Sequence, residues 1–186
     1  MQAAHLRTAL SVVVLGMVSE EQLHPYAMRR RIEERAYDRL PGVKVSSLYD
    51  VVRRLAVEDL IRANEPARTG NRPERTTFAI TPAGLEALLS WIEHTLADDA
   101  DPDGLPAALS FMYSLGRDRA VTVLRAREQR MTEAIDADER ALTCAVSVNP
   151  IFVSEHRYQL ARRRAERDWL AGFLAELDSG TLDWPQ

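Results

Sequence analysis

The sequence predicts a mainly α-helical protein with one small β-hairpin. Apolar residues recur at spacings of three and four over most of the chain, one pair of alternating segments interrupts that pattern, and Pro or Gly separates the periodic segments. The 186 residues, 46% hydrophobic and 28% charged, suit a globular protein of one or two small domains. This composition excludes a disordered chain, and the single cysteine, Cys144, excludes an intrachain disulfide.

Three helices are predicted before residue 60. Residues 5–18 carry apolar side chains at helical spacing, which indicates a helix with one buried face. Pro25 opens a second helix over PYAMRRRIEERAY, because proline is tolerated in the first turn. After the break at Leu40-Pro41-Gly42, a third helix is expected over about 45–58. Its apolar side consists of Val45, Leu48, Val52 and Leu55, and its other side of Ser46, Tyr49, Asp50 and Arg53.

A hairpin and a fourth helix follow. Two alternating stretches, 61–65 and 76–80, flank the basic, Gly- and Pro-containing segment 66–75, which predicts two strands joined by a long basic tip. Thr81 is a good N-cap and Pro82 suits the first helical position, so a helix should begin there. The order helix, helix, helix, hairpin, helix is that of a winged helix-turn-helix.

The second half of the sequence predicts helices alone. Its long central helix, over about 118–146, has a 3-4 spacing like that of coiled-coil seam positions, formed by Val121, Leu124, Glu128, Met131, Ile135, Asp138, Leu142 and Ala145. We expect the acidic seam members to face solvent or an arginine. The predicted division is a winged helix-turn-helix domain over 1–98, a linker over 99–104, a C-terminal helical dimerisation domain over 105–180 and a tail over 181–186.

The last helix, which Asn149-Pro150 starts, is predicted to hold a homodimer together. It has more large apolar residues than a small domain could bury, and an exposed stripe of that size on a globular protein normally marks an interface. A two-fold pairing is the commonest closed arrangement. The residues expected to form the interface are Phe152, Leu160, Trp169, Leu170, Phe173, Leu174 and Leu177.

Three segments, in order and correctly spaced, resemble the PadR family of transcriptional regulators. They are LHPYAMRRRIEER, VSSLYDVVRRLAVEDLI and GNRPERTTFAITPAG. The second half resembles the longer form of that family, with its C-terminal virulence-activator-like helical dimerisation domain. The sequence departs from the family pattern at Pro25, at Asp50 and at Asp59, where glycine usually ends the recognition helix. Aspartate tolerates the left-handed backbone conformation better than most residues, so we expect Asp59 to keep the turn.

Hydroxyl and basic side chains near the third helix and the hairpin tip predict binding to DNA. Residues 1–90 hold 13 basic and 11 acidic side chains, whereas residues 91–186 hold 11 and 17. Hydroxyls and helix N-termini bind phosphate, and arginine can form two hydrogen bonds to guanine. The candidate DNA-binding residues are Lys44, Ser46, Ser47, Tyr49, Arg53, Arg54 and Arg72, the last as a probe of the minor groove or of phosphate. A carboxylate at Asp50 on a DNA-facing surface must accept a hydrogen bond from a base donor such as cytosine N4, or be neutralised by Arg53 or Arg54.

Enzymatic motifs are missing from the sequence. It has no Gly-rich phosphate loop, no H-E-x-x-H, no G-x-S-x-G and no C-x-x-C, so we expect neither an enzyme nor a cofactor nor a metal site. No apolar run approaches the length of a membrane helix, and no signal peptide is apparent, which favours the cytoplasm and no membrane partner.

The predicted function is that of a homodimeric transcriptional regulator, most often a repressor in this family, which binds an inverted-repeat operator in double-stranded DNA. The alternative is a winged-helix interaction or adaptor module without operator recognition. The resemblance also implies a small aromatic or drug-like effector that releases the operator. Its pocket would be formed by aromatic residues that could instead be core or interface packing, namely Trp91, Phe111, Tyr113, Tyr158 and Trp169.

Overall fold

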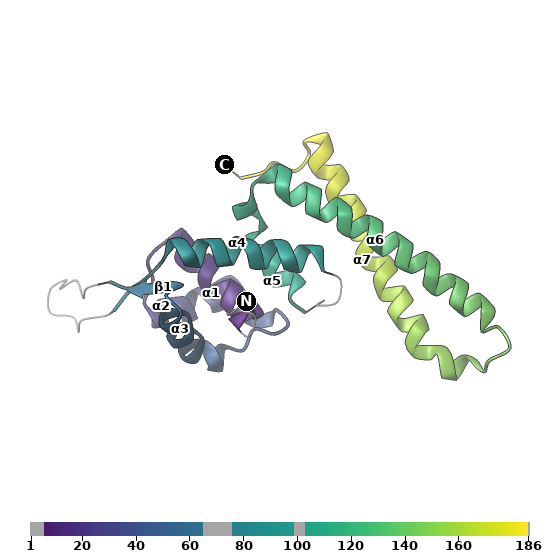
Figure 1. The fold of residues 1–186 in the computed structure, drawn as a ribbon, viewed down its shortest axis with the longest axis horizontal. Helices are drawn as coiled ribbons and strands as arrows, with labels where there is room; N and C mark the ends of the chain where they lie inside the picture. Colours follow the sequence, from purple (N-terminus) through teal and green to yellow (C-terminus); the bar gives the residue numbers. More distant parts are fainter. Residues whose placement is uncertain (1–5, 65–75, 99–102, 186) are drawn as a thin grey trace. The chain divides into compact units, whose positions relative to one another are not determined.

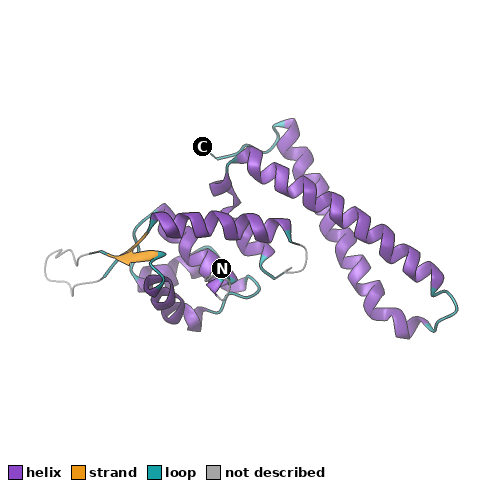
Figure 2. Cartoon of the chain, viewed as in Figure 1, coloured by secondary structure: helices purple, strands orange, loops and turns teal. Residues whose placement is uncertain are grey.

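The structure, a computed structural model, describes residues 6–64, 76–98 and 103–185. Helices dominate it, and its one sheet is a two-stranded antiparallel hairpin (Figure 2). The predicted fold class is therefore confirmed. The chain divides into two compact units, the first of residues 1–96 and 100–115 and the second of residues 97–99 and 116–186.

Helix α1, Ala9–Glu20, is the centre of the first unit (Figure 1). Every residue from Leu10 to Val18 is buried, so the prediction of one buried face is wrong. The reason is that α1 is packed by α3, α5 and strand β2 at once, and a helix surrounded by other elements is apolar on all sides. The Thr8 hydroxyl begins the helix by accepting a hydrogen bond from the Ser11 amide at 3.1 Å.

The helix-turn-helix consists of α2, Pro25–Glu34, and α3, Leu48–Val57. The His24 imidazole caps α2 by accepting from the Ala27 amide at 2.9 Å. The helix ends before residue 37, where the sequence predicted its end, because Ala36 adopts the left-handed conformation with φ of 55°. Short 3₁₀ turns follow at η2, Tyr37–Arg39, and at η3, Val45–Ser47, which leads directly into α3.

After α3, the chain turns into the wing. Asp59 has φ of 56°, which confirms the prediction that it keeps the left-handed turn. Strand β1, Ile61–Ala63, pairs antiparallel with β2, Phe78–Ile80, in the register Ile61 to Ile80. The paired strands are shorter than predicted, and the predicted basic tip at 66–75 lies outside the described residues.

Helix α4, Pro82–Ala97, begins where the sequence predicts. The Thr81 hydroxyl accepts from the Gly84 amide at 2.9 Å and donates to the Asp59 carbonyl at 2.6 Å. One side chain therefore caps α4 and joins it to the turn that ends α3, which fixes the start of α4 against the end of α3.

Helix α5, Leu105–Phe111, and the turn η4, Met112–Leu115, belong to the first unit. Phe111 is fully buried and lies against α1 at Gly16, where any added methyl group would overlap the ring. The predicted division instead assigns residues 105–115 to the dimerisation domain. A domain boundary at 99–104 stays a proposal.

A carboxylate of α1 joins three elements of the first unit. Glu20 accepts hydrogen bonds from the Arg35 guanidinium at 2.9 Å and from the Tyr113 hydroxyl at 2.7 Å. Burial by itself raises the pKa of Glu20, but these two donors and the nearby positive charge hold the pKa below its usual value. The pKa of Tyr113 is raised, mainly because the side chain is partly buried and secondly because its hydroxyl donates a hydrogen bond to Glu20. The cluster therefore links η4 to α1 and to the end of α2.

The second unit is a hairpin of two long helices, α6, Arg117–Cys144, and α7, Ser154–Ser179, which lie side by side (Figure 1). The 3₁₀ turn η5, Pro150–Val153, precedes α7. Asp138 pairs with Arg163 of α7, which confirms that this acidic seam residue faces an arginine. The side chains buried in this unit include Val121, Leu124, Met131 and Ile135 of α6, and Leu160, Leu170, Leu174 and Leu177 of α7.

Candidate nucleic-acid interface

Helix α3 has one buried and one exposed face. It packs against α1, α2 and β1 through Leu48, Val51, Val52 and Leu55, all of which are buried. The opposite face carries Tyr49, Asp50, Arg53 and Arg54, all exposed. Three of these side chains, Tyr49, Arg53 and Arg54, belong to the predicted DNA-binding set, and they lie on the surface of a packed helix. We call the surface formed by Tyr49, Asp50, Arg53 and Arg54 the outer face of α3.

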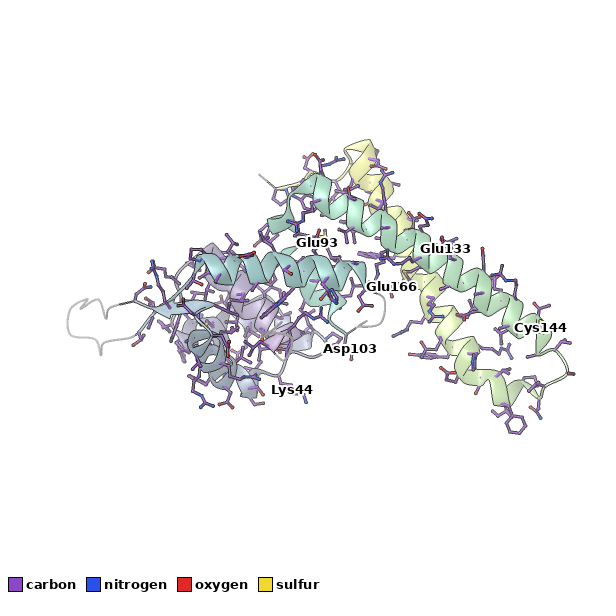
Figure 3. All side chains as sticks on the ribbon, in the orientation of Figure 1. Lys44, Glu93, Asp103, Glu133, Cys144 and Glu166 are labelled. Carbon is purple, nitrogen blue, oxygen red and sulfur yellow. The ribbon has the colours of Figure 1, made fainter. Side chains whose placement is uncertain are left out.

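Polar residues precede this helix. Lys44 is exposed in the loop before η3 (Figure 3), Ser46 is exposed and Ser47 is half-buried. An ammonium and two hydroxyls at the start of a helix are groups that bind phosphate oxygens. The structure therefore brings six of the seven predicted DNA-binding residues to one element and its approach, whereas Arg72 lies outside the described residues.

Ion pairs differ between the two helices of the motif. On α2, Arg29 and Arg30 each pair with a glutamate four residues later, at 3.1 and 2.6 Å. These exposed pairs are the usual surface pattern and contribute little to stability. On α3, Arg53 Nη2 donates to Asp50 Oδ1 at 3.1 Å. This contact gives the Asp50 carboxylate an arginine partner, which is one of the two outcomes that the sequence left open, while a base donor for Asp50 stays a prediction.

Two shallow hollows flank α3. Arg53 and Arg54 line one of about 140 Å³ together with Leu6, Val57 and Glu58. Tyr49 lines the other, of about 370 Å³, with residues from the start of α2 and from the wing, namely His24, Pro25, Tyr26, Thr76 and Phe78. The rings of His24 and Tyr26 stack with centroids 6.1 Å apart, and Tyr26 is exposed.

Tyr26 is a candidate that the sequence reasoning missed. Its hydroxyl and ring extend the exposed surface of Tyr49 onto α2. The available signal was an aromatic residue directly after His24-Pro25, at the outward start of a helix. The sequence pattern predicts only a helix start at that position.

The predicted dimerisation residues separate into two sets. Leu160, Leu170, Leu174 and Leu177 are buried within one chain, because α7 packs along α6. Phe152 is 79% exposed and Trp169 is 48% exposed, and the Trp169 ring stacks on half-buried Phe173 at 5.4 Å. Other exposed apolar residues lie near the turn between α6 and α7, namely Val146, Val148, Ile151 and Tyr158.

The predicted effector-pocket residues lie in both units. Trp91, Phe111 and Tyr113 belong to the first unit, and Tyr158 and Trp169 to the second. Trp91 and Phe111 are buried, and the Phe111 ring packs at 5.6 Å from Tyr37 and 6.4 Å from Tyr113. These contacts explain Phe111 as part of the core, and the pocket stays a prediction.

The described residues contain neither a cluster of metal ligands nor a membrane-spanning helix. In the ranges 6–64, 76–98 and 103–185, no three His, Cys, Asp or Glu side chains are grouped so that they could hold a metal ion. Within the same ranges, no helix has the length and apolar character needed to cross a membrane.

Three packed helices, a two-stranded wing and an exposed outer face on α3 define a winged helix-turn-helix protein. Residues 14–90 match the model of the Transcriptional regulator PadR-like family. This match covers less than half of the chain, and it shows that the winged helix-turn-helix segment is similar to PadR-like transcriptional regulators. No protein of curated function matches the chain.

Solved PadR structures resemble the chain. A PadR-like transcriptional regulator of Bacillus cereus is 24% identical, with 46% of this chain and 79% of that chain covered and a TM-score of 0.39. PadR of Bacillus subtilis in complex with operator DNA is 20% identical, with 89% and 97% covered and a TM-score of 0.41. The same protein in complex with p-coumaric acid is 19% identical, with 91% and 99% covered and a TM-score of 0.40.

Proposed function

We propose that this protein is a cytoplasmic repressor that binds an inverted-repeat operator as a homodimer. The observation that carries the proposal is the outer face of α3, where Tyr49, Arg53 and Arg54 are exposed while the opposite face fills the core. A two-fold dimer presents two such helices, which reach successive major grooves about 34 Å apart or a multiple of that. The approach to α3, with Lys44, Ser46 and Ser47, supplies the phosphate contacts that fix the helix in the groove.

Operator binding is tested with an arginine on each helix of the motif. Arg53→Ala should weaken binding to the operator by roughly 1 to 3 kcal/mol and relax the base preference, if Arg53 contacts guanine through two hydrogen bonds. Arg29→Ala is the matched control, because it removes the same charge from an exposed ion pair on α2. The operator is first selected from fragments of the source genome, and affinities are then measured over a range of salt concentrations, which should show a steep decrease in affinity as salt rises.

Two results of this experiment would contradict the proposal. If the wild-type protein shows no preference for any genomic fragment over random DNA, an adaptor module becomes the better interpretation of its function. If Arg53→Ala and Arg29→Ala bind like the wild type, the outer face of α3 is not the reading surface.

The dimer is proposed to form through the exposed apolar residues of the second unit. Phe152 and Trp169 leave a large apolar area in water although α6 and α7 already cover each other's leucines. Such exposure supports a protein interface, and a second copy gives the two-fold symmetry that an inverted repeat requires. Deleting residues 149–186 would be a poor test, because it would also expose the buried face of α6.

Charge substitutions test the dimer without removing a helix. Phe152→Glu and Trp169→Glu should each shift the chain from dimer to monomer in light scattering, since a carboxylate in an apolar interface is strongly unfavourable. They should also lower operator affinity at least about tenfold through loss of avidity. Ala175→Glu is the control, because Ala175 is exposed on α7 about 120° away from Trp169. A monomeric wild type, or variants that stay dimeric, would disprove this interface.

Release by a small aromatic or drug-like effector is proposed on the predicted pocket alone. p-Coumaric acid, which is bound in a structure of Bacillus subtilis PadR, is the first compound to add to the operator-binding measurement. We expect a decrease in operator affinity that depends on its concentration. Unchanged affinity with a panel of phenolic and drug-like compounds would count against an effector of this class.

A further inference from the structure

We propose that Asp50 and Arg53 together recognise one G·C base pair or two adjacent ones. Arg53 binds guanine, and Asp50 accepts a hydrogen bond from the N4 amino group of cytosine. This inference rests on the proposed operator binding, and it names the bases that the outer face of α3 recognises. It starts from the one carboxylate on that face, Asp50, and from its contact with Arg53.

A carboxylate on this surface needs an explanation. Asp50 is 69% exposed and lies next to Tyr49 and one turn before Arg53 and Arg54. Where DNA phosphates approach, an exposed negative charge weakens binding to every sequence. A base donor can offset this cost, and cytosine N4 is the donor that aspartate and glutamate accept from in the major groove.

The ion pair leaves both side chains able to contact bases. The recorded bond joins one guanidinium nitrogen, Arg53 Nη2, to one carboxylate oxygen, Asp50 Oδ1, at 3.1 Å. A guanidinium has five N–H donors and a carboxylate has two acceptor oxygens, so each group keeps capacity for a second partner. Arg53 is 74% exposed, which leaves that capacity open to a ligand. The pair therefore orients a donor and an acceptor side by side.

Helix geometry matches the spacing of base pairs. Residues three positions apart are separated by about 4.5 Å along the axis and about 60° around it. Successive base pairs are separated by about 3.4 Å along the duplex. Because the Arg53 guanidinium and the Asp50 carboxylate also lie 3.1 Å apart, we expect them to reach the same or adjacent base pairs. Guanine offers O6 and N7 to the arginine, while cytosine offers N4 to the aspartate.

The test is selection of operator sequences from a random duplex library with the full-length protein and its variants. The wild type should select a guanine and, at the same or the next base pair, a cytosine. Asp50→Ala should lower the preference for that cytosine about fivefold or more while the other selected positions persist. Asp50→Asn should gain tolerance of adenine there, because asparagine pairs with adenine N6 and N7.

Glu58→Ala is the matched control. Glu58 is an exposed carboxylate at the end of the same helix, so its removal changes the charge by the same amount. Both alanine variants should bind random DNA more tightly than the wild type, but only Asp50→Ala should lose the cytosine. Unchanged base preference for Asp50→Ala, or the same loss with Glu58→Ala, overturns the inference and leaves operator binding intact. A wild type that selects no sequence instead contradicts the proposed function itself.

Discussion

Replacing Gly84 by alanine should destabilise the winged helix by about 3 kcal/mol or more, at the upper end of what overpacking costs. The added Cβ would lie 1.8 Å from the carbonyl oxygen of Leu60 and 3.0 Å from Ile80 Cγ1. The Leu60 carbonyl cannot move freely, because it accepts a hydrogen bond from the Thr81 amide at 3.1 Å. The first turn of α4 and the start of β1 would have to separate.

Gly172→Ala is the matched control for this substitution. Gly172 lies inside α7, and a Cβ there meets no atom within 4 Å, so alanine should stabilise the protein by up to about 1 kcal/mol through its helix propensity. Thermal and urea unfolding of both variants measures the difference. A Gly84→Ala protein as stable as the wild type would show that α4 does not approach Leu60 this closely.

Replacing Arg127 by alanine should cost the second unit about 3 kcal/mol, the lower end of the loss measured when one partner of a buried ion pair is removed. Arg127 is 1% exposed, and its guanidinium donates to Glu166 of α7 at 2.9 and 2.6 Å. Figure 3 labels Glu166 on α7. It also donates to the carbonyl of Asp98, just after α4. The truncation would leave the Glu166 carboxylate and that carbonyl without these donors in a largely buried place.

An exposed pair on the same two helices provides the comparison. Arg125 donates to both oxygens of Asp178 at 2.8 and 2.7 Å in a solvent-exposed position, so Arg125→Ala should cost less than about 1 kcal/mol. The double variant Arg127→Met/Glu166→Met should recover much of the stability, because apolar groups of similar volume replace both charges. Equal unfolding midpoints for Arg127→Ala and Arg125→Ala would contradict a buried ion pair.

Local features of the sequence determined much of the fold. Thr81 and Pro82 start α4 as predicted, and Asp59 keeps its left-handed turn, because capping and backbone preference act over a few residues. The order of helices and hairpin follows from periodicity, which reports the faces that each element must bury. The outer face of α3 was likewise predictable, since the helical periodicity places Leu48 and Leu55 on one side of the helix and Tyr49 and Arg53 on the other.

Contacts between distant segments decided the rest. Periodicity placed Glu128 on the seam of α6, but the structure buries Arg127 instead, because Glu166 of α7 and the Asp98 carbonyl surround its guanidinium. The leucines of α7 were predicted to meet a second chain, yet α6 covers them within the same chain. A single sequence shows that a side chain must be buried but not which segment covers it. That choice depends on the tertiary packing, in which residues 39 positions apart form the Arg127–Glu166 pair.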